Sequence, residues 1–360
     1  MTWTLGPFTK ADAVNPILEP RSTSNFYCPV RQQPVRWEEK DVFNPCAVVR
    51  NGQVYLFYRA EDTVGRYKGT SRIGLAVSSD GLRFERHGTP VLYPDHDNMY
   101  EQEWEGGCED PRITEDEQGT YYMTYTAYSG RAIRLCLATS TNLLHWQKQG
   151  VIADIGEDYS EQSGQGMKAG TIVSRRVGDR LVATRIHGSY YMYWGAITLR
   201  LATSPDLLHW RRVQDAAGED IRVLKPRSEQ YRHTDNMEVE AGPAAVLTET
   251  GIVVLYNGVH NSLPLEERVF TEQGPRYGNT WVGVQALFDQ ENPTKLLQRA
   301  EAPFLQPERD YERTGQIGNV TFIEGLVPFQ GQWFLYYGTA DSKIAVAVSS
   351  IRQHGLLSNK

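Results

Sequence analysis

The phrase LCLATSTNLLHW, at residues 135–146, decides the fold because the chain repeats it. It returns as LRLATSPDLLHW at residues 199–210 and, more loosely, as IGLAVSSDGLRF at residues 73–84. Weaker copies are VGVQALFDQENP from residue 282 and IAVAVSS from residue 344. Self-similarity at a fixed interval is the sequence signature of a repeat architecture. The chain is therefore expected to consist of copies of one small unit.

Two further strand-like phrases precede each copy. The nearer one is apolar, as in VYLFYRAED from residue 54 and WFLYYGTAD from residue 333. The farther one ends in a turn signal, as in FNPCAVVRNG at residues 43–52. Short apolar runs bounded by such turns are typical of antiparallel strands. Five copies of the unit predict an all-β protein, a five-bladed β-propeller with a central funnel. A β-sandwich is the rival fold, but it does not suit a five-fold repeat.

The repeats also suggest how the chain is divided. We expect residues 41–360 to form a single catalytic propeller, and residues 1–40 to form an arm or a closing strand. Two polar stretches, residues 211–236 and 261–279, are expected to be rim loops that shape the substrate cleft. Trp146 and Trp210, which end the repeated phrase, are interpreted as packing between blades.

Composition excludes several classes of function. The net charge is −7 and no basic run is present, so nucleic acid is not an expected partner. No apolar stretch is long enough to span a membrane, and no secretory signal is seen, so a cytoplasmic location is expected. The cysteines and histidines lack metal-ligand spacing, so neither a metal nor a cofactor is expected. The sequence does not indicate an oligomeric state. The cysteines, interpreted as reduced thiols, are Cys28, Cys46, Cys108 and Cys136.

Polar and acidic residues recur in the first strand-like phrase of successive copies. The innermost strands of a propeller line its central channel, so these side chains are expected to converge on one funnel. A glycosidase requires such convergence, with carboxylates on both sides of the scissile bond. The residues concerned are Asn44, Glu109, Asp110, Lys168, Glu238, Glu240 and Glu324.

Three of these positions favour acid–base chemistry. Glu238 and Glu240 are separated by one apolar residue, and residues two apart in a strand share a face. Crowded like charges raise the pKa of one partner, a common device in catalytic sites. Asp110 is followed closely by Arg112, whose guanidinium can hold a carboxylate or a sugar hydroxyl. Which glutamate acts as a base is left open by these patterns.

Several phrases together resemble glycoside hydrolase family 130, which contains mannoside phosphorylases and β-1,2-mannosidases. They are FNPCAVVRNGQVYLFYRAED, GCEDPRIT, AGP after Glu240, LYNGV, and GNVTFIEG followed by YYGTAD. The resemblance implies a five-bladed propeller, an inverting mechanism on a β-mannosyl residue, and Asp110 as the catalytic acid. In the phosphorylases this Asp is thought to act through the sugar 3-hydroxyl as a proton relay. The expected substrate-binding residues are Asn44, Arg59, Glu109, Arg112, Tyr125, Lys168, Arg185, Asn257 and Asp341.

The sequence departs from the phosphorylases of the family at the positions where those enzymes bind phosphate. Glu238 replaces a lysine, Glu240 a glycine, Asn257 a histidine and Glu324 a cysteine. Each cation–phosphate contact amounts to about 4 kcal/mol at an effective dielectric constant of about 20, so a reversed charge should repel phosphate. A carboxylate there can instead deprotonate water. Asp110 is thus the expected acid, and Glu238, Glu240 or Glu324 the base, of an inverting hydrolase of β-1,2-linked or other β-linked manno-oligosaccharides.

Three alternatives stay open. The first is an inverting mannoside phosphorylase that produces mannose 1-phosphate. The second is a non-catalytic sugar-binding propeller, which would need no paired carboxylates. The third is another five-bladed glycosidase, such as an arabinanase-like enzyme with three carboxylates in its channel.

Overall fold

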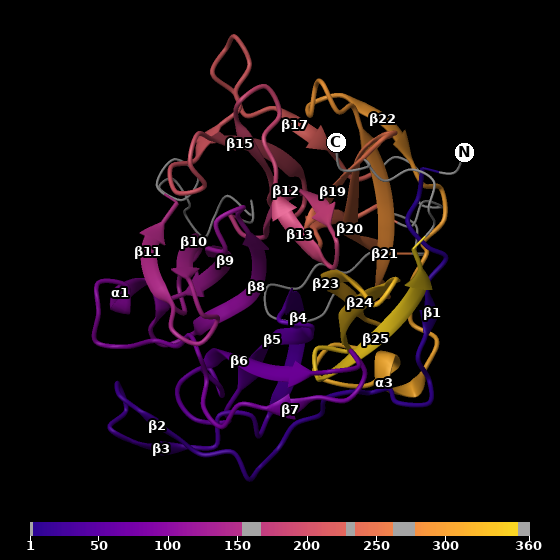
Figure 1. The fold of residues 1–360 in the computed structure, drawn as a ribbon. Coiled ribbons are helices and arrows are strands. Elements are labelled where there is room, and N and C mark those ends of the chain that lie inside the picture. The colour runs from indigo at the N-terminus through magenta and orange to yellow at the C-terminus, as the bar shows by residue number, and fades with distance from the viewer. Residues whose placement is uncertain (1–2, 153–166, 228–234, 262–277, 352–360) are drawn as a thin grey trace.

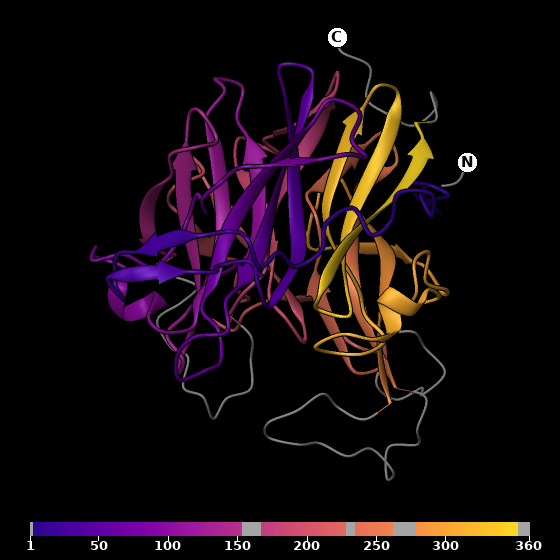
Figure 2. The same ribbon diagram turned by 90° about the horizontal axis from the view of Figure 1, so that it is seen from below.

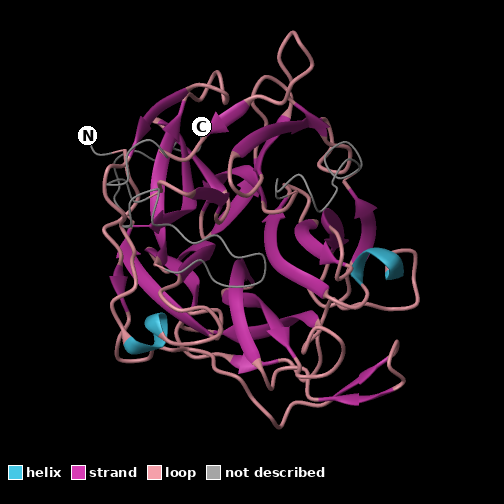
Figure 3. Cartoon of the chain, turned by 180° about the vertical axis from the view of Figure 1, so that it is seen from behind, coloured by secondary structure: helices cyan, strands magenta, loops and turns pink. Residues whose placement is uncertain are grey.

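The chain is built almost entirely from antiparallel strands, which confirms the all-β class. The structure, a computed structural model, describes residues 3–152, 167–227, 235–261 and 278–351. Figure 1 shows the strands arranged in groups around a common centre. The helices in these ranges are single turns on the outside of the molecule, α1 (Tyr100–Glu103) and α3 (Asp310–Arg313) (Figure 3).

In each group, strands that follow one another in sequence pair from the centre outward, because short turns join them. Group 1 contains β4 (Asp41–Arg50), β5 (Gln53–Glu61), β6 (Ser71–Ser78) and β7 (Glu85–Arg86). Group 2 contains β8 (Gly107–Glu115), β9 (Tyr121–Tyr128), β10 (Ile133–Ser140) and β11 (Gln147–Val151).

The next two groups follow the same plan, with an interrupted second strand (residues 180–194) in group 3 and an interrupted innermost strand (residues 238–248) in group 4. Group 3 contains β12 (Gly170–Val177), β13 (Arg180–Ala183), β14 (Tyr190–Trp194), β15 (Leu199–Ser204), β16 (Arg211–Arg212) and β17 (Arg222–Leu224). Group 4 contains β18 (Glu238–Ala241), β19 (Ala245–Thr248), β20 (Gly251–Asn261), β21 (Asn279–Phe288) and β22 (Leu296–Arg299).

The last group joins the two ends of the described chain. Figures 1 and 2 show the indigo strand near the N-terminus beside the yellow C-terminal strands. There Thr9 pairs with Val348, and Lys10 with Ala347. A separate hairpin of β2 (Phe26–Cys28) and β3 (Gln33–Val35) lies outside the groups. Group 5 contains β23 (Thr321–Phe329), β24 (Gln332–Thr339), β25 (Lys343–Ser350) and β1 (Thr9–Lys10).

The apolar core lies between neighbouring groups. Strand β9 illustrates the cause, since alternate side chains point to opposite faces. Met123 packs against group 1 through Phe57, whereas Tyr122 packs against group 3 in a cluster with Met192. Similar clusters join groups 3 and 4, groups 4 and 5, and groups 5 and 1. Trp146 and Trp210 belong to clusters of this kind, as the sequence predicted.

The repeated phrase builds the same turn three times. Ser140 and Asn142 accept backbone N–H bonds in the turn that leads to Trp146. Gly81, Leu143 and Leu207 occupy its tightest position, with φ of 74°, 70° and 70°. A positive φ is strained for leucine, so burial of both leucines must offset this cost.

Four groups share a buried unit that we call the tyrosine–acid–cation unit. A tyrosine of the second strand donates its hydroxyl to an acid located just before the innermost strand. A cation from the outermost strand binds the same acid. In group 3 the Tyr193 hydroxyl instead donates to the carbonyl of Pro293, at 2.8 Å. The units are Tyr58–Glu38–Arg86, Tyr125–Glu103–Lys148, Tyr256–Asp235–Arg299 and Tyr337–Glu312–Lys10.

Parts of the two polar stretches fall outside the described residues, namely 228–234 and 262–277. The described part of the first stretch includes β16 and β17. No helix within the described ranges has the length and apolar character needed to cross a membrane.

Candidate active site

Three innermost strands carry an extra residue at the same level. The pairing register shifts between Phe43 and Pro45 in β4, between Glu109 and Arg112 in β8, and around Glu324 in β23. Such bulges bend a strand and re-aim a side chain. They involve Asn44, Asp110 and Glu324, of which Asn44 and Asp110 have φ of 46° and 48°. Asn and Asp tolerate this conformation better than other residues with side chains.

Asp110 is buried among donors. The Nδ2 group of Asn44 donates to its Oδ1 atom at 2.9 Å, and Nη1 of Arg59 does so at 3.4 Å. The Nζ atom of Lys168 lies 3.9 Å from its other oxygen. Burial alone would raise the pKa of Asp110, but Arg59, Lys168 and Asn44 outweigh it and hold the pKa below its ordinary value. Asp110 is therefore ionised when no substrate is bound.

The carboxyls beside Asp110 behave in the opposite way. Burial raises the pKa of Glu109 to about 7, against the pull of Arg59 and with help from the Asp110 charge. Burial likewise raises the pKa of Asp341 to about 7. Glu109 and Asp110 are neighbours and interact, so they titrate as a pair. Near neutral pH, Glu109 is therefore the member of the pair that holds a proton.

The other cations of the centre are matched by carboxylates. The Nζ atom of Lys168 lies 3.0 Å from Oε1 of Glu240. The Nη1 atom of Arg112 lies 2.6 Å from Oε1 of Glu324. Burial raises the pKa of Glu324 well above its ordinary value, although Arg112 opposes this effect. Within the described residues, Oε2 of Glu324 is buried without a hydrogen-bond partner, so it can meet a water or a sugar hydroxyl.

Arg112 also links three groups. Its Nε and Nη2 atoms donate to the carbonyls of Gly242 and Ala241, at 3.0 and 2.6 Å, in group 4. Its Nη1 atom reaches the carbonyl of Asp110 at 3.2 Å, in addition to Glu324 of group 5. With these partners, Arg112 fixes the positions of Asp110 and Glu324 relative to each other.

Glu238 and Glu240 alternate along β18, as the sequence predicted, so their side chains leave the strand on the same side. Glu240 is nearly buried and Glu238 is half-buried. In β20 they face Val259 and Asn257, respectively.

Three predicted substrate contacts are placed differently from the others. Oδ1 of Asn257 accepts from the backbone N–H of Ile323 at 2.7 Å and its Nδ2 donates to the carbonyl of Ile323 at 3.0 Å, so this side chain positions the neighbouring Glu324. Tyr125 lies in the core between groups 1 and 2, where it bonds Glu103. Arg185 is exposed and packs over Tyr190, 4.5 Å from the ring centre. These placements do not support direct contact of Asn257 or Tyr125 with a sugar in the funnel.

Two residues of the centre were missed in the sequence. Glu61 accepts a bond from Arg59 at 2.7 Å, and Ser71 donates to Glu109 at 3.2 Å. Glu61 lies two residues after Arg59 in β5, on the same face, so strand alternation could have found it. Ser71 had no comparable signal, because it lies at the start of β6.

Neither metal nor thiol chemistry gains support from the described residues. No group of three or more His, Cys, Asp and Glu side chains in these ranges is placed to hold a metal ion. The cysteines are unpaired and buried, and burial raises the thiol pKa of Cys46 and Cys108 well above the ordinary value. A thiolate nucleophile is therefore disfavoured.

The comparisons with known proteins identify the family of the chain. A family profile described as beta-1,4-mannooligosaccharide phosphorylase, that of glycoside hydrolase family 130, matches residues 9–354. The chain belongs to glycoside hydrolase family 130. The recognised proteins of this family act on mannosides.

Three relatives illustrate the range of the family. A 1,2-beta-oligomannan phosphorylase of Thermoanaerobacter sp. (strain X514) is 31% identical, covering 88% of this chain and 92% of the relative. A solved structure of a putative glycoside hydrolase from Parabacteroides distasonis is 41% identical, with a TM-score of 0.86 over 97% of this chain and 98% of that one. A third is described as "The GH130 family of mannoside phosphorylases contains glycoside hydrolases that target beta-1,2 mannosidic linkages in Candida mannan". It is 38% identical, with a TM-score of 0.85 over 98% of each chain.

Proposed function

We propose that this enzyme hydrolyses β-1,2-linked manno-oligosaccharides with inversion at the anomeric carbon. The supporting observation is the pairing of Lys168 with Glu240, at 3.0 Å, and of Arg112 with Glu324, at 2.6 Å. These cations would be the natural partners of a phosphate dianion. Because a carboxylate already neutralises each one, phosphate would have to displace a short ion pair in a buried site.

The proposed reaction uses one carboxyl on each side of the bond. Asp110 supplies the proton that the leaving oxygen takes up, through the sugar 3-hydroxyl. Glu240 takes a proton from the water that attacks the anomeric carbon, with Glu238 as the neighbouring candidate. Glu324 fits the role of base less well, since Arg112 already holds its Oε1 atom at 2.6 Å. The products are mannose, first as the α-anomer, and a shortened oligosaccharide.

The substrate-binding roles proposed for Asn44, Arg59, Glu109, Lys168 and Asp341 rest on the same geometry. Asn44, Arg59 and Lys168 surround Asp110, and Asp341 shares its charge environment. Hydroxyl groups of a sugar can both donate to the carboxylates and accept from the cations.

The proposal includes the architecture. The strand groups are interpreted as five blades of one propeller formed by residues 41–360, with the N-terminal segment supplying the closing strand β1. The apolar clusters between groups support this interpretation, since stacking is what buries both faces of each blade.

Phosphorolysis is the second candidate, and one observation favours it: the relative with an assigned activity at 31% identity is a phosphorylase. The two solved structures with hydrolase descriptions share more sequence with this chain, 41% and 38%. This difference favours hydrolysis.

The test is turnover of β-1,2-mannobiose with and without inorganic phosphate, followed by proton NMR. Hydrolysis predicts α-mannose at the earliest times and equal rates in both buffers. A strict requirement for phosphate, with mannose 1-phosphate as product, would establish the phosphorylase. Absence of turnover in both buffers, with activity on an arabinan, would favour the arabinanase-like alternative.

A further inference from the structure

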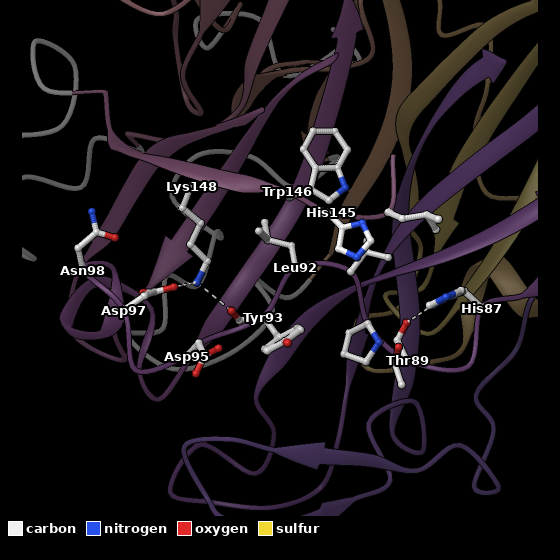
Figure 4. Close-up of a pocket in the computed structure, with 13 residues that line it drawn as sticks. His87, Thr89, Leu92, Tyr93, Asp95, Asp97, Asn98, His145, Trp146 and Lys148 are labelled. Carbon is white, nitrogen blue, oxygen red and sulfur yellow. Dashed lines mark hydrogen bonds and ion pairs between the residues drawn. The ribbon is translucent and has the colours of Figure 1, made fainter. Parts of the chain in front are cut away.

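Two grooves of similar size lie on the outer rim, away from the central carboxylates. The first, rim groove 1, has a cavity volume of about 530 Å³. It lies between the segment 87–98 that follows β7 and the end of the repeated phrase in group 2 (Figure 4). The second, rim groove 2, measures about 540 Å³ and lies between β11 and the same phrase in group 3. Both volumes fall in the usual range for small-molecule sites.

The two grooves are equivalent positions of the repeat. Leu144, His145 and Trp146 line rim groove 1, and Leu208, His209 and Trp210 line rim groove 2. In each case the facing wall is the outermost strand, or its continuation, of the preceding group. The repeat therefore presents the same three side chains twice.

The exposed leucine of that phrase makes no bond that holds the turn, whereas the exposed histidine bonds a turn residue, Asn142 in group 2 and Asp206 in group 3. The turn is held by Asn142 in group 2 and Asp206 in group 3, through bonds to backbone N–H groups. The preceding leucine of each turn is buried and supplies the packing. Leu144 and Leu208 remain 42% and 40% exposed, so these apolar surfaces are available to a ligand.

Rim groove 1 combines rings with hydrogen-bonding groups. Figure 4 shows Tyr93, His145 and Trp146 along its length, with Asp95 and Asn98 near one end. Rings stack on the apolar face of a sugar, whereas carboxylates and amides bond its hydroxyls. This mixture suits a neutral polyhydroxylated chain.

The cation of the groove is already committed. Lys148 donates to the carbonyl of Tyr93 at 2.8 Å, to Asp97 at 2.9 Å and to Glu103 at 2.5 Å. An ammonium group has three donors, so none remains for an anionic ligand. The same three bonds hold β11 against Tyr93, Asp97 and Glu103. A preorganised site loses less conformational entropy on binding.

We propose that rim groove 1 binds a neutral oligosaccharide chain outside the active site, with rim groove 2 as a second contact for a longer chain. The identity of the chain, a manno-oligosaccharide, rests on the proposed function. Two such sites on one rim would hold a long chain more firmly than either alone, because the second contact is intramolecular. Activity on mannobiose would not depend on them.

The test observes the grooves directly. The full-length Asp110→Asn enzyme, labelled with ¹⁵N, is titrated with β-1,2-mannotetraose, and the indole N–H signals of Trp146 and Trp210 are followed. Trp146→Phe and Trp210→Phe assign the signals. We expect saturable shifts of the Trp146 signal, and a several-fold weaker affinity in His145→Ala. Leu297→Ser, which changes an exposed leucine outside the grooves, is the matched control and should leave the affinity unchanged.

The outcomes separate the two proposals. If neither indole signal moves with mannotetraose at millimolar concentration, the groove proposal is wrong, whatever the turnover assay gives. A shift with cellotetraose alone would overturn the mannoside assignment of the grooves. Failure of the proposed function would appear instead as a lack of turnover by the unmodified enzyme. His145→Ala should keep full activity on mannobiose, and a loss there would count against a separate site.

Discussion

The side chain of Asp110 combines two properties that oppose each other in a proton donor. Its neighbours hold its pKa below the ordinary value, yet the proposed reaction needs a proton at this position. The adjacent Glu109, with a pKa of about 7, supplies a nearby reservoir. A sugar hydroxyl that bonds Asp110 can then pass its own proton to the leaving oxygen and recover one from the pair.

Asp110→Asn should therefore abolish turnover with little loss of binding. The amide keeps the shape and the contact with Asn44 but cannot supply the relayed proton, and loss of general acid catalysis lowers kcat by about 10²–10⁴-fold. Steady-state rates on mannobiose measure kcat, and calorimetry measures the affinity. Unchanged kcat would remove Asp110 from the mechanism.

Glu240→Ala should expose a latent anion site. The change frees Lys168 from its partner at 3.0 Å and removes a negative charge 3.9 Å from Arg112. We expect phosphate to raise the melting temperature of this variant, with no such effect on the unmodified enzyme. Sodium chloride at equal ionic strength is the control. A phosphate-dependent rise in the unmodified enzyme would contradict the charge argument.

At the scale of the element, the tyrosine–acid–cation unit connects the inner and outer edges of a group. In group 5, Lys10 is 7% exposed and lies 2.7 Å from Glu312, which is fully buried. Breaking a buried pair costs far more than breaking an exposed one, because it leaves a charge without compensation.

Lys10→Met should destabilise the protein by roughly 3–5 kcal/mol. The matched control is Lys343→Met in the neighbouring β25, whose pair with Glu19 is largely exposed. That change should cost at most about 1 kcal/mol. Urea unfolding followed by tryptophan fluorescence gives the free energy of unfolding of both variants. Equal decreases would mean that the buried ion pair stabilises the protein no more than the exposed one.

The elements were more predictable than the site they carry. Alternating apolar phrases, turn signals and the repeat located the strands of the groups, because burial on both faces leaves a strong pattern. The only sequence signal of the bulges at Asn44 and Asp110 is the proline that follows each residue. Tyr125 looked like a sugar contact because its aromatic pattern is the same whether a ring faces a channel or a core. The partners of Asn257 lie 66 residues away, beyond any local pattern.

At the scale of the molecule, the centre contains more carboxyl side chains than cationic ones. Arg59, Arg112 and Lys168 face a larger number of carboxyls, and burial raises the pKa of some of these. The raised pKa values are about 7 for Glu109 and Asp341. At the edge of group 1, Asp41 has a pKa of about 6, raised mainly by burial.

Stability should consequently fall as the pH rises from about 5 to about 8. The folded protein retains protons that the unfolded chain, with carboxyl pKa values near 4, has already released, and each unit of raised pKa corresponds to about 1.4 kcal/mol. The contribution is complete below the unfolded pKa and is lost through pH 6 to 7. Melting temperatures across this range test it, and Asp341→Asn should flatten the slope. A rise in stability with pH would refute the assignment.

The pairing of β1 with β25 has a consequence for folding during synthesis on the ribosome. Thr9 leaves the ribosome long before its partner Val348 is synthesised. Until β25 has been synthesised, β1 has no strand with which to pair. Slow synthesis of the residues between the two strands prolongs that exposure, so molecular chaperones should bind the chain most readily before β25 has been made.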